Sequence, residues 1–242
     1  MISLSEPIGI IIAQCIINKT NWKIDNLMFT LNCKAILFDL DGTLIDSAPR
    51  IQRLWHDWGK RHGIAPQSIL EFMHGRRADE TISLVAPHLA LKDEVYALET
   101  DEVSDMDGVN PYSSAKDLLS KLSAKQWAIV TSGSVRVASA RIKHVGLPTP
   151  DIFITADDVK RGKPSPDGYL LAANRLSLKP SDCVVVEDAP AGIQAGKAAG
   201  MKVIAVASSI SQEELHQADV VVQQLADIKL NVTGREINIQ FK

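Results

Sequence analysis

Short apolar runs alternate with longer amphipathic stretches along the chain from about residue 33 onward. The runs are rich in valine and isoleucine and apolar on both faces, a pattern typical of parallel strands buried on both sides of a sheet. We predict such strands near residues 35–38, 128–130, 152–154, 184–186 and 203–206, and helices near 115–122, 135–144, 168–176 and 191–199. Strand and helix in regular alternation predict an α/β fold with a doubly wound, Rossmann-like parallel sheet.

One stretch, residues 47–111, interrupts this alternation. It contains no convincing strand, and its apolar spacing predicts helices near 51–61, 68–74, 79–89 and 93–106. About 65 residues is far longer than an ordinary connection between elements. We therefore expect an α-helical domain inserted into a core that is built from residues 33–46 and 112–242.

The first part of the chain has no counterpart in this pattern. We expect residues 1–32 to be an N-terminal extension in which residues 1–27 have no folded role, with an added strand or a surface helix as the alternative. The apolar run from Ile8 to Ile17 is too short to span a bilayer, and no Lys or Arg precedes it as in a signal peptide. We expect a cytoplasmic protein that does not enter a membrane.

The composition is that of an ordinary globular protein, which excludes disordered, collagen-like and coiled-coil chains. The 242 residues include 26 basic and 29 acidic ones, for a net charge of -3. Because no segment is strongly basic, the chain lacks the electrostatic signature of nucleic-acid binding. The cysteines Cys15, Cys33 and Cys183 follow no zinc or disulfide spacing, so we expect free thiols in a reducing compartment. We expect a monomer.

Polar segments follow four of the predicted strands, at the sheet edge where open α/β sheets carry their sites. In the first segment, the turn at Gly42 allows the carboxylates of Asp39 and Asp41 to face a common centre. In the second, Thr131 and Ser132 precede a helix whose N–H groups suit a phosphate or carboxylate. Each segment alone also has an ordinary explanation, the first as a turn and the second as a helix cap.

The other two segments contain a lysine and an acidic pair. Lys163 lies in a loop stiffened by two prolines, which suits a fixed counter-charge, although a single loop lysine is usually solvated. Glu187 and Asp188 are adjacent at a strand end, where they repel each other unless a cation lies between them. Asp188 is also a candidate cap for the following helix. Oxygen ligands of this kind favour Mg²⁺ over zinc.

Taken together, the four segments resemble the motifs of the haloacid dehalogenase superfamily. The four matching segments, in motif order, are Asp39-Leu40-Asp41-Gly42-Thr43, Thr131-Ser132-Gly133, Gly162-Lys163-Pro164 and Val185-Val186-Glu187-Asp188. The resemblance extends from about Cys33 to Val222. It implies that the inserted domain is the α-helical cap of the phosphatase and mutase branch, and the likeness is greatest to bacterial sugar- or hexitol-phosphate phosphatases.

The resemblance implies a role for each residue. Asp39 would be the nucleophile that attacks phosphorus and becomes an aspartyl-phosphate, and Asp41 would act as acid and then as base. Mg²⁺ would be held by Asp39, the backbone carbonyl of Asp41 and Asp188, with Glu187 in support. The phosphoryl oxygens would be bound by Thr131, Ser132 and Lys163.

The implied substrates are small phosphorylated sugars or polyols, that is, hexose, pentose or hexitol phosphates. The cap would choose among them. Its candidates for contact with the leaving group are Ser47, His74, Arg76 and Arg77. A charged helical face that is simply solvated is the alternative for these four residues.

Other functions of the same scaffold fit less well. A phosphomutase of the β-phosphoglucomutase type carries a cap histidine where this chain has Ile51, and it remains the alternative function. Phosphonoacetaldehyde hydrolysis needs a cap lysine, and Lys60 and Lys92 lie in no recognisable motif. A 2-haloacid dehalogenase lacks the second acid of the first motif. A binding module without catalysis would be expected to have lost these carboxylates.

Overall fold

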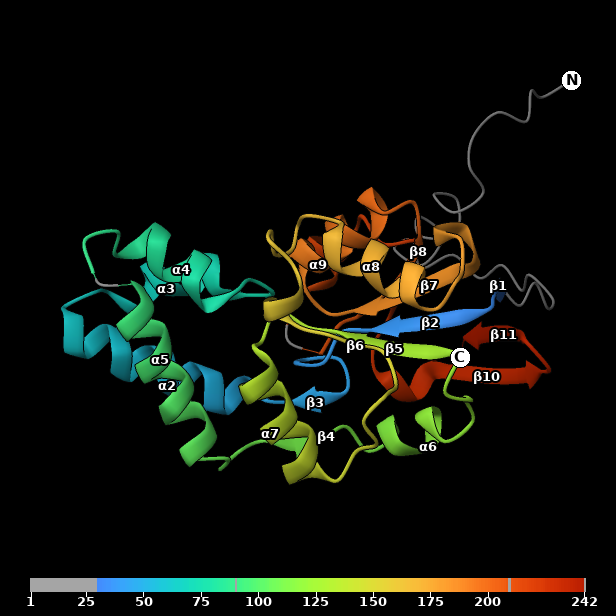
Figure 1. The fold of residues 1–242 in the computed structure, drawn as a ribbon, viewed down its shortest axis with the longest axis horizontal. Coiled ribbons are helices and arrows are strands. Elements are labelled where there is room, and N and C mark those ends of the chain that lie inside the picture. Colours follow the sequence, from blue (N-terminus) through green and yellow to red (C-terminus); the bar gives the residue numbers. More distant parts are fainter. Residues whose placement is uncertain (1–29, 90, 209, 242) are drawn as a thin grey trace, which may run out of the picture.

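The main sheet of the protein is parallel, as predicted (Figure 1). The computed structural model describes residues 30–89, 91–208 and 210–241, and within them six parallel strands have the order β6-β5-β2-β7-β8-β9. These strands are β2 (Ala35–Phe38), β5 (Trp127–Val130), β6 (Phe153–Ile154), β7 (Cys183–Glu187), β8 (Lys202–Val206) and β9 (Val220–Val222). Sequence analysis misses β9, a short edge strand that is only partly buried.

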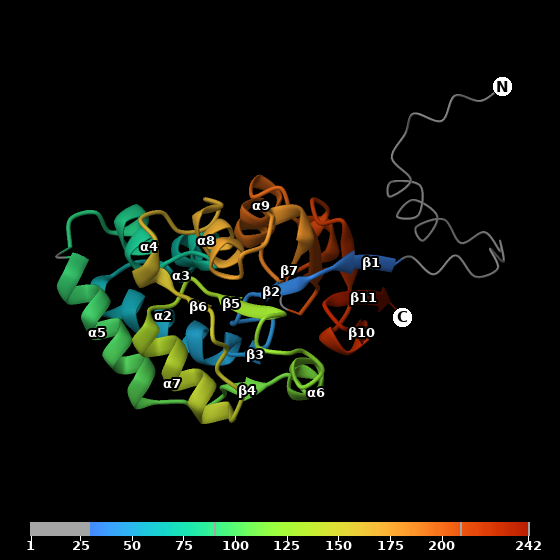
Figure 2. The same cartoon turned by 45° about the vertical axis from the view of Figure 1, so that its right-hand side comes forward.

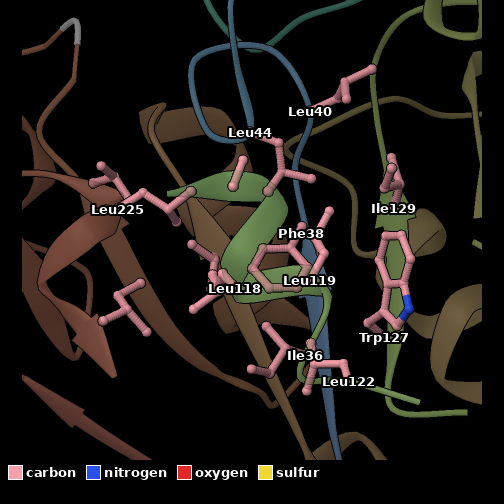
Figure 3. Packing of buried hydrophobic residues seen from close by; sticks show 14 of the residues in the cluster. Ile36, Phe38, Leu40, Leu44, Leu118, Leu119, Leu122, Trp127, Ile129 and Leu225 are labelled. Carbon is pink, nitrogen blue, oxygen red and sulfur yellow. The ribbon is translucent and has the colours of Figure 1, made fainter. Parts of the chain in front are cut away.

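Helices cover both faces of this sheet (Figure 1). One face carries α6 (Ala115–Leu119) and α7 (Val135–Val145), and the other carries α8 (Asp167–Arg175) and α9 (Pro190–Ala198). Successive side chains of a strand point to opposite faces. Accordingly, Ile36 and Phe38 join an apolar cluster with α6 (Figure 3), whereas Leu37 joins the cluster of α8 and α9. The predicted fold class is confirmed. Short 3₁₀ turns are η1 (Ala156–Asp158), η2 (Pro180–Asp182), η3 (Gln212–Leu215) and η4 (Leu225–Asp227).

Sequence analysis also misses a second sheet, which is antiparallel. Among the described residues it contains β1 (Thr30–Cys33), β10 (Ile228–Thr233) and β11 (Glu236–Phe241), with β11 in the middle. Ile237 and Ile239 are fully buried and join the cluster that contains Ile36. Residues 30–32 therefore belong to the core and not to the predicted extension, because β1 pairs with β11. Residues 1–29, including Cys15, lie outside the described residues.

The inserted domain is helical and joins the core at a short two-stranded ladder. Its helices are α2 (Ala48–His62), α3 (Pro66–Met73), α4 (Ala78–Val85) and α5 (Leu91–Ser104). Strand β3 (Ile45–Asp46) pairs with β4 (Asn110–Pro111), so the two chain segments that link cap and core lie side by side. Trp58, Ile82 and Leu98 are almost completely buried in an apolar core that belongs to the cap itself.

The cap lies at the end of the sheet toward which the arrow of β2 points (Figures 1 and 2). The carboxyl ends of the parallel strands therefore face the cap, and the strand-end residues lie between the two domains. No helix in the described ranges combines the length and the apolar character that crossing a membrane requires.

Candidate active site

A cleft of about 480 Å³ separates the carboxyl ends of the sheet from the cap. Strand β2 lies between β5 and β7, so the residues that follow these three strands meet at one edge. The predicted residues that line the cleft are Asp39, Asp41, Thr131, Ser132 and Asp188. The remaining two, Lys163 and Glu187, are buried beside Asp39. The structure thus brings the residues of all four motifs together.

Lys163 is a buried counter-charge. Its ammonium group donates to Oδ1 of Asp39 at 2.5 Å, to Oε1 of Glu187 at 2.7 Å and to the carbonyl of Val130 at 3.0 Å. Burial by itself lowers the pKa of Lys163, but the ion pairs with Asp39 and Glu187 outweigh it and raise the pKa above its ordinary value. The lysine therefore stays charged, and the explanation of Lys163 as a solvated loop residue is wrong.

Asp39 is a carboxylate in an unfavourable place. It follows β2, is 6 % exposed, and its backbone N–H donates to the carbonyl of Val186 at 2.9 Å. Burial raises the pKa of Asp39 well above its ordinary range; Lys163 opposes this effect, and the neighbouring Glu187 and Asp188 add to it. The positive charge of Lys163 is what opposes protonation of this buried carboxylate.

Glu187 organises the residues around it. Its Oε1 accepts hydrogen bonds from Lys163 and from the hydroxyl of Tyr169 at 2.7 Å each, and its Oε2 accepts from the backbone N–H groups of Asp188 and Ala189. Sequence analysis misses Tyr169, because an aromatic residue on a helix face normally indicates packing alone. The hydroxyl of Tyr169 is one of the four donors that hold the buried carboxylate of Glu187 in place.

Asp39, Glu187 and Asp188 form a buried acidic group whose carboxylate oxygens lie within 4.8 Å of one another. Such oxygens are suitable ligands for a hard divalent cation. Asp39 and Asp188 line the cleft and Glu187 does not, so Asp39 and Asp188 fit the role of side-chain ligands better. Helix α9 has Ala189 as its N-cap residue, so the explanation of Asp188 as a helix cap is wrong.

Gly42 makes room for the acidic group. Its φ is +88°, and a Cβ atom at this position would lie 2.0 Å from Oδ2 of Asp188. Any other residue would therefore push the carboxylate of Asp188 away from Asp39 and Asp41. The Asp-Gly turn is present, as the ordinary explanation of this segment expects, and it also positions the acidic group.

Asp41 is held by two donors. The hydroxyl of Ser47 donates to Oδ1 at 2.7 Å, and Nη1 of Arg141 lies 2.8 Å from Oδ2. Arg141 is buried in α7 and also contacts Glu102 of the cap at 2.5 Å. Sequence analysis misses Arg141, although a signal exists: the residue lies on the buried face of α7 beside Ile142, where a charge requires partners.

Thr131 and Ser132 lie at the carboxyl end of β5. The hydroxyl oxygen of Thr131 accepts from the backbone N–H of Gly133 at 3.1 Å, and the hydroxyl of Ser132 donates to the carbonyl of Gly75 in the cap at 2.8 Å. The helix cap of this segment is Ser134, whose side chain accepts from the backbone of α7. Thr131 and Ser132 are therefore available for a role other than capping.

The cap candidates lie in the same cleft. Ser47 contacts Asp41, as described above. The other candidates that line the cleft are His74, Arg76 and Arg77. The cap also contacts the loop that carries Lys163, because the carboxylate of Glu80 accepts from the backbone N–H of Gly162 at 3.0 Å. The cap therefore covers the site as a lid does.

Residues 33–200 match the family of haloacid dehalogenase-like hydrolases. The chain belongs to this family. Hexitol phosphatase A of Escherichia coli (strain K12) is 47 % identical over 206 residues, which cover 82 % of this chain and 94 % of that protein. Glycerol-1-phosphate phosphohydrolase 2 of Saccharomyces cerevisiae (strain ATCC 204508 / S288c) is 35 % identical over 218 residues, which cover 83 % of this chain and 86 % of that protein.

A solved structure shares the fold. The crystal structure of CbbY from Rhodobacter sphaeroides in complex with phosphate aligns with a TM-score of 0.72 at 27 % identity, and the alignment covers 81 % of this chain and 96 % of that one. The family predicted from the four motifs is thus confirmed, and so is the prediction that the protein is an enzyme.

Proposed function

We propose that this hydrolase is a Mg²⁺-dependent phosphatase that releases inorganic phosphate from hexose, pentose or hexitol phosphates. The observation that carries the proposal is the buried carboxylate of Asp39, held by Lys163 at the floor of a lidded cleft. Burying like charges together is unfavourable for folding, and functional sites are where such arrangements concentrate. The similarity to a hexitol phosphatase and a glycerol-1-phosphate phosphohydrolase supports phosphorylated polyols as substrates.

Asp39 is the nucleophile in this proposal. Lys163 fixes its carboxylate through Oδ1, and Oδ2 attacks the phosphorus atom of the substrate. A bond from Asp39 to phosphorus forms while the bond from phosphorus to the sugar oxygen breaks, which leaves an aspartyl-phosphate. Thr131 and Ser132 bind the phosphoryl oxygens, and Ser132 gives up its bond to Gly75 to do so. Lys163 stabilises them by its positive charge, because its three N–H groups are already donated.

Asp41 moves the protons. The cycle starts with Asp41 protonated, and Asp41 first donates this proton to the departing sugar oxygen, so that the sugar leaves as an alcohol and not as an unstable alkoxide. It then takes a proton from the water molecule that attacks the aspartyl-phosphate. The bond between phosphorus and Asp39 breaks, inorganic phosphate leaves, and both carboxyl groups return to their starting states.

A divalent metal ion fits the acidic group. Asp39, the backbone carbonyl of Asp41 and Asp188 would hold Mg²⁺, and its positive charge would offset the repulsion between a carboxylate and a phosphate. Glu187 supports this arrangement by holding Lys163 and the start of α9 in place.

The cleft has the size and lining for a sugar phosphate. About 480 Å³ lies within the range of small-molecule sites. Gln52 and Glu99 of the cap line it and offer partners for sugar hydroxyl groups. Ile51 lines it as well, and its apolar side chain can neither donate nor accept a proton where a mutase of this fold carries histidine. The phosphatase is therefore favoured over the phosphomutase.

The described cysteines agree with a reducing compartment. Cys33 and Cys183 are buried and free. Because structural disulfides are typical of oxidising compartments, two free thiols support the proposal that the reaction takes place in the cytoplasm.

The proposal is tested by phosphate release from a panel of hexose, pentose and hexitol phosphates, with Mg²⁺ and with EDTA. We expect release from several members of the panel and its loss in EDTA. The panel includes β-glucose 1-phosphate, with glucose 6-phosphate measured alongside. Formation of glucose 6-phosphate without phosphate release would establish the mutase instead, and release that persists in EDTA would contradict the metal requirement.

The Gly42→Ala variant should lose most of its phosphatase activity. Alanine at φ +88° is strained by about 1 kcal/mol, and its Cβ would overlap the carboxylate of Asp188. The matched control is Gly146→Ala, because Gly146 also has a positive φ of +66° and a Cβ there meets nothing within 4 Å. Both variants should melt a few degrees lower, and only Gly42→Ala should fail in the assay. Equal activity of the two variants would contradict the placement of Asp188.

A further inference from the structure

We propose that Arg141 is a positioning residue that holds the carboxylate of Asp41 and, through Glu102, makes this hold depend on the cap. The inference rests on the proposed role of Asp41 as acid and base. It adds an arginine outside the four motifs, and a cap carboxylate that reaches the acid through this arginine.

The carboxylate of Asp41 is fixed at both of its oxygens. Ser47 donates to Oδ1 at 2.7 Å, and Arg141 contacts Oδ2 at 2.8 Å. Two donors on two oxygens set the plane of a carboxylate as well as its place. Ser47 and Arg141 are 1 % and 3 % exposed, so water has little access to either bond. The direction in which Asp41 presents its acid group therefore depends on these two side chains.

The same guanidinium group reaches the cap. Nη2 of Arg141 lies 2.5 Å from Oε1 of Glu102, which belongs to α5. Helix α5 lies beside α7, which carries Arg141 (Figure 2). Arginine suits this place because its planar fork of N–H groups can bind two carboxylates at once. One buried cation thus joins the acid of the core to a carboxylate of the lid.

This connection links the chemistry to the position of the cap. While the cap covers the cleft, Arg141 is held between two anions and Asp41 is held by Arg141. When the cap moves away, Glu102 moves with it, and the guanidinium group loses one of the two partners that fix it. Asp41 is then fully oriented only while the lid excludes water from the reacting phosphate.

The test compares two substrates that differ in their need for an acid. Sorbitol 6-phosphate must lose a sugar alkoxide, which requires a proton, whereas p-nitrophenyl phosphate loses an anion that is stable without one. In Arg141→Met we expect kcat/KM to fall about 10- to 100-fold for sorbitol 6-phosphate and about 3-fold or less for p-nitrophenyl phosphate. Because kcat/KM covers the steps up to departure of the leaving group, loss of the acid changes the ratio of the two values through kcat, whereas a change confined to KM reports altered sugar binding.

The cap arm of the proposal is tested separately. Glu102→Gln should lower kcat/KM for sorbitol 6-phosphate about 5-fold, because a misplaced Arg141 misplaces Asp41. The ratio of the two kcat/KM values should shift in the same direction as in Arg141→Met. In Arg141→Lys, the ratio of the two kcat/KM values should lie between those of the parent and of Arg141→Met. In the double variant Arg141→Met/Glu102→Gln, residue 102 is neutral and needs no cation beside it. The two substrates are therefore measured on this variant if Arg141→Met does not fold.

Lys143→Met is the matched control. Lys143 also lies on α7, two residues beyond Arg141, but it is exposed and does not line the cleft. It should leave the ratio unchanged. If Arg141→Met and the double variant lower both substrates equally, Arg141 only stabilises the fold and the inference is wrong. If the unaltered enzyme hydrolyses neither substrate, the proposed function itself fails, and that result is separate from an unchanged ratio in an active enzyme.

Discussion

The Asp39→Asn variant is expected to fold normally and to release phosphate from sugar phosphates at least about 10⁴-fold more slowly, the order of loss that follows removal of a covalent nucleophile. The amide of asparagine has nearly the shape of the carboxylate, and its oxygen can still accept from Lys163. It cannot form the bond to phosphorus. The measurement is kcat for the best substrate of the panel, together with the melting temperature.

The melting temperature separates this prediction from a loss of structure. Burial raises the pKa of Asp39, and Glu187 and Asp188 repel its charge, so the ionised carboxylate opposes folding. In EDTA the neutral asparagine should therefore melt at the same temperature as the parent or slightly higher. Asp151→Asn, the same change at an exposed position, should alter neither kcat nor the melting temperature. An Asp39→Asn variant with more than about a hundredth of the parent kcat would rule out Asp39 as the nucleophile.

The Lys163→Met variant should be both inactive and less stable. Methionine roughly preserves the length of the side chain but removes the cation that two buried carboxylates, Asp39 and Glu187, share. Breaking a buried ion pair from one side typically destabilises a protein by about 3–5 kcal/mol, because the remaining charge stays buried. We expect a loss of this size in the free energy of unfolding, measured by denaturant titration in EDTA.

The stability loss of Lys163→Met should grow with pH. In the parent, the raised pKa of Lys163 means that its contribution is fully present below the unfolded lysine pKa, about 10.4, and is lost only as pH rises through the folded value. In both proteins the raised pKa of Asp39 means that stability is lost as pH rises above its unfolded value of about 3.9. This loss is larger in the variant, because Lys163 no longer opposes the rise in the pKa of Asp39. The difference should therefore be larger at pH 9 than at pH 6.

Lys160→Met provides the comparison within the same loop. Lys160 is exposed, so its replacement should change the free energy of unfolding by no more than about 0.5 kcal/mol at either pH. A Lys163→Met variant as stable as Lys160→Met would mean that the two carboxylates need no cation in the folded protein.

Much of the core could be read from local pattern. The apolar runs at β2, β5 and β7 are strands because buried parallel strands require apolar residues on both faces. The polar segments that follow them also reach one edge for a local reason, since parallel strands present their carboxyl ends together. Lys163 was identified in the same way, from its segment and its place after a strand.

The pairing of distant segments was not accessible from local pattern. Strand β1 pairs with β11, about 200 residues further along the chain. After its buried first residue, β10 alternates between exposed and half-buried residues, and β11 has only two buried residues, Ile237 and Ile239. Such strands have no strong apolar run, and nothing local specifies their partners. Residues 30–32 were assigned to the extension for this reason.

The same distinction holds within the site. The carboxylates of Asp39, Asp41 and Asp188 belong to sequence motifs, whereas Tyr169 and Arg141 belong to helices whose spacing indicates only packing. Their roles depend on which buried charge lies opposite, Glu187 for Tyr169 and Asp41 for Arg141. Local sequence specifies secondary structure and the order of chemical groups, but a buried charge is stabilised by partners that only the packing of core and cap brings within hydrogen-bond distance.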